Sequence, residues 1–152
     1  MILRVVLATL LATALVAVSL PAIERASVES TETQLRATMS QFQTAIETLP
    51  ERTDPVSPER ALTHQTLTLR LPERAWTRAR VSSVRIAPTP TGGVLRWQVS
   101  AGAVHTVFIE GVPLKTPAQP DGIQLTEPGT HRLALTLETH DGTPAVAVRR
   151  LP

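Results

Sequence analysis

Hydrophobic residues dominate the first twenty positions of the chain. The run from Ile2 to Leu20 is interrupted only by Arg4 and a few hydroxyl side chains, and Pro21 closes it. At about 1.5 Å per residue, this run forms roughly 28 Å of helix, which is enough to cross a hydrocarbon core of about 30 Å. The pattern therefore predicts a transmembrane anchor over residues 1–22.

A cleaved signal peptide is the main alternative for this segment, and a buried helix of a soluble domain is a third. Arg4 supplies a short positive region, and Ala17-Val18-Ser19 is a small-x-small site of the kind that signal peptidase accepts. The apolar run is longer than the usual signal core of about 7–15 residues, and little charge precedes it. We therefore favour a retained anchor.

The charges around the run predict its orientation in the cell membrane. Arg4 and the α-amino group precede the span, whereas Arg25 is the only cation between the span and Arg36, among three glutamates. Under the positive-inside rule, we expect the N-terminus in the cytoplasm and the rest of the chain outside.

A second helical pattern follows over residues 23–50, and it predicts an amphipathic stalk helix. No Pro or Gly occurs between Ile23 and Leu49, and Pro50 is expected to end the helix because the residue before a proline disfavours the helical conformation. The apolar stripe on one face of this helix consists of Val28, Leu35, Met39, Phe42, Ile46 and Leu49.

Two interpretations of the apolar stripe stay open. In the first, the stripe packs on the β domain of its own chain, which is favoured because the heptad phase lasts only about three repeats and includes Glu32. In the second, the stripe is a seam for a partner helix or a second copy. The candidate partner-contact residues are then Leu35, Met39, Phe42, Ile46 and Leu49.

Prolines mark both ends of the stalk helix. Pro21 has no N–H to bond the carbonyl of Ala17, so we expect a kink between the anchor and the stalk. After the stalk, Pro55 and Pro58 indicate an extended linker over residues 51–60, which has little apolar surface to bury.

Beyond residue 60 the period of the apolar positions changes from about 3.6 to 2, which indicates strands in residues 61–152. Leu67, Leu69 and Leu71 alternate with polar residues in a strand that ends at Pro72. Similar patterns predict strands around residues 83–86, 95–99, 104–109, 123–126, 133–138 and 146–148.

Turn signals separate these strands. Residues 88–93 form a Pro- and Gly-rich connection, Asp141-Gly142 is a strong hairpin signal, and the proline-rich segment 111–119 is expected to be a surface loop. Residues 107–109 are apolar on both faces, which we expect of a strand in the middle of a sandwich or beneath the stalk helix.

Six or seven short antiparallel strands make a mainly β fold with an N-terminal helix, and an immunoglobulin-like β-sandwich is the leading architecture. The alternative is a pilin-like helix packed on one antiparallel sheet. The two differ in whether the stripe packs on a sheet. Trp97, in phase with Leu95 and Val99, is predicted in the core, whereas Trp76 is either a core plug or an exposed contact.

The composition limits the chemistry. There is no cysteine, so disulfides and thiolate metal sites are absent. The sequence pI is about 10.4, yet the formal net charge is only +2, because nearly all cations are arginines and few groups titrate above neutral pH. We expect no nucleic-acid partner, since aromatic residues do not interleave the cations.

No catalytic constellation is visible, and we predict neither an enzyme nor a cofactor. His64, His105, His131 and His140 lie far apart in sequence without His-x-x-x-His spacing or adjacent acidic clusters, so no metal site is expected. The sequence has no Gly-x-Ser-x-Gly elbow, phosphate-binding loop or dinucleotide fingerprint, and its acidic residues show no acid–base pairing.

Five arginines concentrate in a short segment whose single acid is Glu73. A solvated strand face is one interpretation of this segment. The other is a face for an anionic partner such as lipid headgroups, a surface polysaccharide or an acidic protein. The candidate residues of that face are Arg70, Arg74, Arg78, Arg80 and Arg85.

Several phrases carry a family resemblance. The start MILRVVLA, the exit Leu20-Pro21-Ala22, and the strand phrases at residues 67–72 and 146–150 resemble the small single-span membrane proteins of unknown function found in haloarchaea. The resemblance spans the whole chain and implies an association with pilus or secretion genes. The chain departs from the usual haloarchaeal acidity, and it lacks the leader and early acid of a processed pilin.

These observations predict a non-enzymatic, single-pass membrane protein whose extracytoplasmic β domain acts through protein contacts. An accessory role in a surface appendage or secretion assembly fits this organisation, with the lipid bilayer and a protein partner or a second copy as partners. The alternative is an exported soluble module that binds an anionic ligand through the arginine-rich face.

Overall fold

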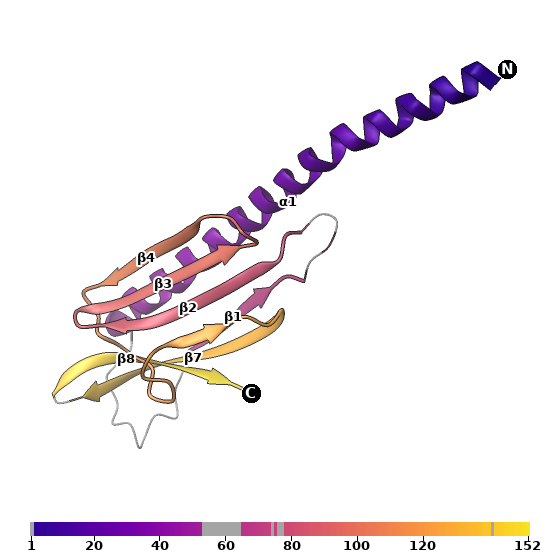
Figure 1. Ribbon diagram of the computed structural model, residues 1–152. Coiled ribbons are helices and arrows are strands. Elements are labelled where there is room, and N and C mark those ends of the chain that lie inside the picture. Colours follow the sequence, from indigo (N-terminus) through magenta and orange to yellow (C-terminus); the bar gives the residue numbers. More distant parts are fainter. Residues whose placement is uncertain (1, 53–64, 74, 76–77, 141) are drawn as a thin grey trace.

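The computed structural model describes the whole chain except residues 1, 53–64, 74, 76–77 and 141. One long helix projects from a mainly β domain (Figure 1). The described elements are α1 (Ile2–Arg52), β1 (Gln65–Leu71), β2 (Val81–Thr89), β3 (Gly92–Val99), β4 (Val104–Glu110), β5 (Leu114–Lys115), β6 (Ile123–Leu125), β7 (Gly129–His140) and β8 (Thr143–Leu151).

Helix α1 is unbroken over 51 residues and contains both Pro21 and Pro50. The predicted anchor and stalk are thus parts of one helix, and the expected end at Pro50 is wrong because the helix continues to Arg52. A proline removes a single N–H from the ladder, and the hydrogen bonds on both sides of it keep the helix continuous. Of the predicted linker, Glu51 and Arg52 are helical, and residues 53–60 lie outside the described residues.

The strands form two sheets of four, in the orders β1-β7-β8-β5 and β4-β3-β2-β6. All pairs are antiparallel except β5 with β8. The predicted mainly β fold with an N-terminal helix is confirmed. The hairpin between β7 and β8 is also confirmed, with Gly142 at a φ of 78° in its turn, where glycine avoids the strain of a side chain.

The proline-rich segment 111–119 contains a strand that the sequence analysis missed. Leu114 is only 1% exposed, and β5 pairs in parallel with Val146 and Ala147 of β8. A two-residue strand shows no periodicity, so only the tertiary structure identifies it. The prediction of a surface loop is wrong at this point.

The second half of α1 packs into the core of the β domain. It contacts β3 and β4 of one sheet and β7 and β8 of the other. This confirms the first interpretation of the stripe and corrects the second, because the stripe is inaccessible to a partner helix. The five candidate contact residues have exposed fractions between 0% and 6%: Leu35, Met39, Phe42, Ile46 and Leu49.

The architecture thus combines features of both alternatives. It has two sheets, as in a sandwich, and a helix packed on strands, as in a pilin-like subunit. Trp97, 2% exposed, lies in the core as predicted, and Trp76 lies outside the described residues.

Candidate functional site

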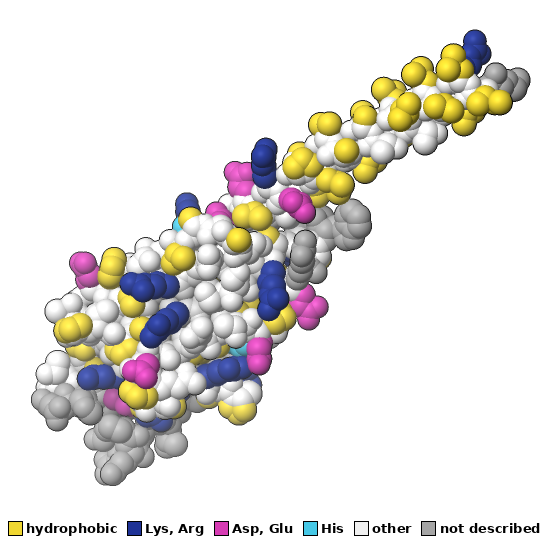
Figure 2. Space-filling model, in the orientation of Figure 1, with side chains coloured by type: hydrophobic (Ala, Val, Ile, Leu, Met, Phe, Trp, Pro, Cys, Tyr) yellow, Lys and Arg dark blue, Asp and Glu magenta, His cyan; other side chains and the backbone are white. Residues whose placement is uncertain are grey.

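The first half of α1 is an exposed apolar surface. Every residue from 2 to 26 that the structure describes is exposed, and Figure 2 shows hydrophobic side chains on all visible sides of this projecting end. The hydroxyls of Thr9 and Thr13 donate to the carbonyls of Val5 and Thr9 at 2.9 and 2.8 Å. These bonds satisfy the hydroxyls within the helix, as a hydrocarbon environment requires. The helix is long and apolar enough to cross a membrane.

Just beyond this surface, a hydrogen bond at Thr31 links α1 to the connection between β1 and β2. The Ala79 N–H donates to Thr31 Oγ1 at 3.0 Å, and the Thr31 hydroxyl donates to the Ser27 carbonyl at 2.8 Å. Thr31 is 3% exposed. It is not one of the apolar stripe residues, but it lies on their face of the helix, three residues after Val28 and four before Leu35.

A polar cluster joins α1 to the start of β4. His105 Nε2 lies 3.5 Å from Glu32 Oε1, and the imidazole stacks on Trp97 with ring centroids 5.4 Å apart. His105 Nε2 and Trp97 Nε1 are buried and have no hydrogen-bond partner among the described residues. Glu32, which weakened the coiled-coil interpretation of the stripe, therefore faces the β domain.

The two histidines whose side chains the structure describes do not converge. His131 is buried, with Nε2 2.8 Å from the Glu127 carbonyl, whereas His105 lies in the cluster with Glu32. No group of three potential metal-ligating side chains occurs among the residues that the structure describes.

The predicted arginine face is distributed over several elements. Arg70 is on β1, Arg78 and Arg80 are in the connection to β2, and Arg85 is on β2 in the other sheet. All four are exposed, and Arg74 lies outside the described residues.

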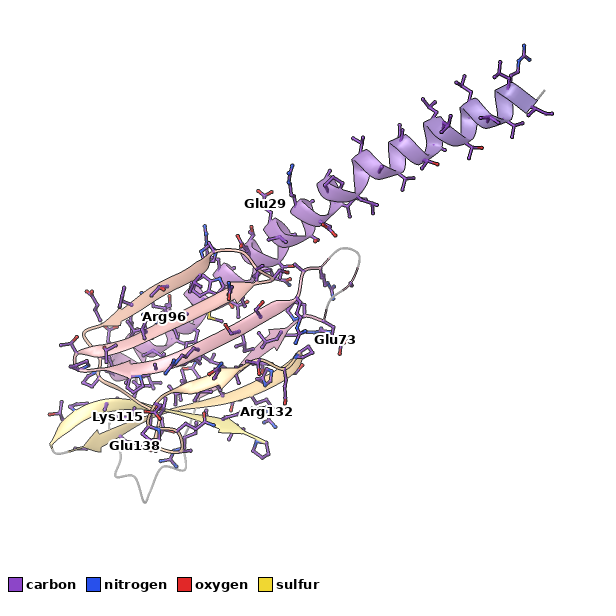
Figure 3. All side chains as sticks on the ribbon, in the orientation of Figure 1. Glu29, Glu73, Arg96, Lys115, Arg132 and Glu138 are labelled. Carbon is purple, nitrogen blue, oxygen red and sulfur yellow. The ribbon has the colours of Figure 1, made fainter. Side chains whose placement is uncertain are left out.

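The structure adds a cation to this set, because Arg85 is directly opposite Arg96 of β3. Figure 3 labels Arg96 on its strand. The Arg85 guanidinium donates to the Asp121 carbonyl at 3.0 Å, so part of its hydrogen-bonding capacity is used within the chain. Because Arg96 lies outside the arginine segment, the sequence does not show that it is a neighbour of Arg85.

A second charged group lies on the outer face of β7 and β8. Arg149 donates to Glu138 Oε1 at 2.9 Å, and the Glu138 side chain is only 10% exposed. Both residues line a mostly apolar hollow of about 430 Å³ together with Lys115, Pro117 and Pro120. Figure 3 labels Glu138 and Lys115. Because Arg149 neutralises the carboxylate, we assign this pair a structural role.

Strand β4 differs most from its prediction. It is an edge strand of its sheet, and Val104 and Phe108 are each 60% exposed, whereas Ile109 is buried. The expectation of a strand covered on both faces is therefore wrong for Phe108. Periodicity detects apolar faces but does not distinguish a central strand from an edge strand.

The fold and these surfaces define a class: a β domain of two sheets built around a helix whose other half is exposed and apolar. The chain belongs to the DUF7311 family, a domain of unknown function, whose family model matches residues 2–151. The match extends over almost the whole chain, as the resemblance to proteins of unknown function did. No curated protein and no solved structure matches this chain.

Proposed function

We propose that this protein is a single-pass membrane protein without enzymatic activity. It holds its β domain at the outer surface of the cell membrane for contacts with other proteins. The observation that carries this proposal is the division of α1 into two surfaces. The first half exposes apolar side chains, and the second half buries its stripe among the strands. One helix is thus both the membrane anchor and part of the domain core.

The continuity of α1 has a mechanical consequence. A flexible linker would let the domain rotate freely relative to the membrane, whereas an unbroken helix fixes its orientation. The bond between Thr31 and Ala79 and the Glu32–His105 contact attach the domain close to the apolar half. A fixed orientation suits a subunit that must meet its neighbours at a set height, such as an accessory component of a surface appendage or secretion assembly.

The rival function, a soluble module that binds an anionic ligand, has less support. The described arginines come from both sheets and from the connection between them. Arg85 also donates to a carbonyl of its own chain. An uncleaved soluble chain would in addition expose the apolar half of α1 to water, which is unfavourable.

The absence of cysteine allows a direct test of topology, because one introduced cysteine is a unique label site. In intact cells that express Thr126→Cys, we expect a membrane-impermeant maleimide to label the β domain without lysis. Ala12→Cys, within the apolar half, should stay unlabelled because the bilayer shields it. Labelling of Thr126→Cys only after lysis would place the domain inside the cell and contradict the proposal.

A further inference from the structure

Most of strand β4 lacks the charged, Pro and Gly residues that commonly protect the edge of a sheet. From Val104 to Ile109 the sequence is VHTVFI, with no formally charged residue, Pro or Gly. Edge strands in native proteins commonly carry such residues, which prevent pairing with other chains. Outside α1, Val104 and Phe108 are the exposed large hydrophobic residues of the described part of the chain. The edge is thus free of formal charge up to Ile109, and its one charged residue is Glu110 at the end of the strand.

The backbone of β4 also offers hydrogen bonds at this edge. Gln43 Nε2 donates to the Phe108 carbonyl at 3.4 Å, so this carbonyl points away from β3 and toward the open side. In an antiparallel ladder, the direction of the backbone groups alternates along the strand. Val104, Thr106 and Phe108 therefore present their N–H and C=O groups on the open side, and their side chains are exposed.

We propose that β4 accepts an extended segment of a different polypeptide as an added strand. Strand addition to an exposed sheet edge gains affinity from main-chain hydrogen bonds and specificity from alternate side chains. The inference rests on the proposed function, because it names the surface through which the domain makes its protein contact.

The direction of β4 relative to the anchor argues against a second copy as the added strand. Glu32 meets His105 near the start of β4, and Gln43 meets Phe108 near its end. Strand β4 and α1 therefore run in the same direction, away from the apolar half (Figure 1). Antiparallel pairing of two β4 strands in one continuous sheet would point the two anchors in opposite directions, so both could not enter one bilayer.

The surroundings of the edge indicate the chemistry of the added segment. On the outer face, its side chains would lie beside Val104 and Phe108, which favours apolar residues. On the other face they would lie toward α1, where Gln43 also donates to Glu47 Oε1 at 2.8 Å. The Glu47 carboxylate favours basic or polar residues there. The expected partner is an uninterrupted strand with apolar residues at alternate positions and basic or polar residues between them.

A synthetic peptide tests this surface without knowledge of the natural partner. The probe is the acetylated and amidated hexapeptide Lys-Val-Thr-Val-Lys-Val, added to the full chain in detergent micelles. We expect saturable binding and slower hydrogen exchange of the Thr106 and Phe108 amides, measured by nuclear magnetic resonance. The same peptide with alternate N-methylated amides should have no effect, because it cannot complete the ladder. Unchanged exchange at all soluble peptide concentrations would overturn the inference.

Variants of β4 then localise the binding. Thr106→Pro removes an N–H on the open side and keeps the bonds to β3, so it should abolish peptide binding in a folded protein. Phe108→Lys is a second variant that leaves the backbone unchanged, and it should weaken binding several-fold. Thr68→Lys, on the exposed face of edge strand β1, is the matched control and should bind normally. Equal loss in the control would overturn the assignment to β4.

Two further outcomes separate this inference from the proposed function. A dimer detected by sedimentation in detergent and lost in Thr106→Pro would identify a second copy as the occupant and overturn our choice of a different polypeptide. A membrane-anchored chain without peptide binding would refute the β4 surface alone. Peptide binding by a chain that is absent from membranes would support the surface and refute the anchor.

Discussion

At the scale of single residues, the side chains of the stripe contribute most to the stability of the fold where the sheets enclose them completely. Ile46 has no exposed surface, and Met39 is 1% exposed. Both belong to one continuous hydrophobic core with residues of both sheets. Removing part of such a side chain loses burial and also leaves a cavity that close-packed neighbours fill only partly.

Ile46→Ala should therefore lower the free energy of unfolding by about 2–5 kcal/mol. The measurement is a denaturant titration of the full chain in detergent, followed by tryptophan fluorescence. Ser40→Ala, at an exposed position of the same helix, is the control and should change stability by less than about 0.5 kcal/mol. If both variants had equal, small effects, α1 would not be part of the core.

At the scale of elements, the attachment of α1 to the β1–β2 connection depends on one buried hydroxyl. Thr31 accepts the Ala79 N–H, and no other partner of that N–H is found among the described residues. A buried donor that loses its acceptor keeps the full cost of its desolvation. This one contact should therefore contribute measurably to the stability of the protein.

Replacing Thr31 with Val keeps the shape of the side chain and removes the acceptor. Thr31→Val should cost about 1–3 kcal/mol and speed the hydrogen exchange of the Ala79 amide. Thr33→Val is a matched control, because Thr33 is exposed and its hydroxyl bonds only the Glu29 carbonyl of its own helix. Equal stability of the two variants would show that the Thr31–Ala79 bond does not fasten the helix.

The elements also show what the sequence could predict. Apolar positions that repeat with periods of 3.6 and 2 residues located the stripe of α1 and most strands. Burial of one face of a helix or strand leaves such a repeating pattern in the sequence. These periods did not identify β5, the edge position of β4 or the pairing of Arg85 with Arg96. Those features depend on which strands become neighbours, and no local pattern contains that information. The proline signal failed at Pro50, because the helix continues to Arg52.

In the molecule as a whole, the two halves of α1 differ in their surroundings. One half has no neighbours among the described residues that cover its apolar side chains, and the other is enclosed by strands. Burial of the exposed half in hydrocarbon would remove this apolar surface from water, and the unbroken helix would transmit its orientation to the β domain. The proposed position of the β domain outside the membrane follows from that arrangement. The proposed choice of a different polypeptide as the partner of β4 follows from it as well.

The most direct test is the fate of the full-length chain in its own cells, measured by alkaline washing of membranes and mass spectrometry of the retained protein. We expect the chain to stay in the washed membrane pellet with its N-terminus at Met1 or Ile2. Release into the supernatant, or a mature N-terminus at or beyond Leu20, would contradict this expectation.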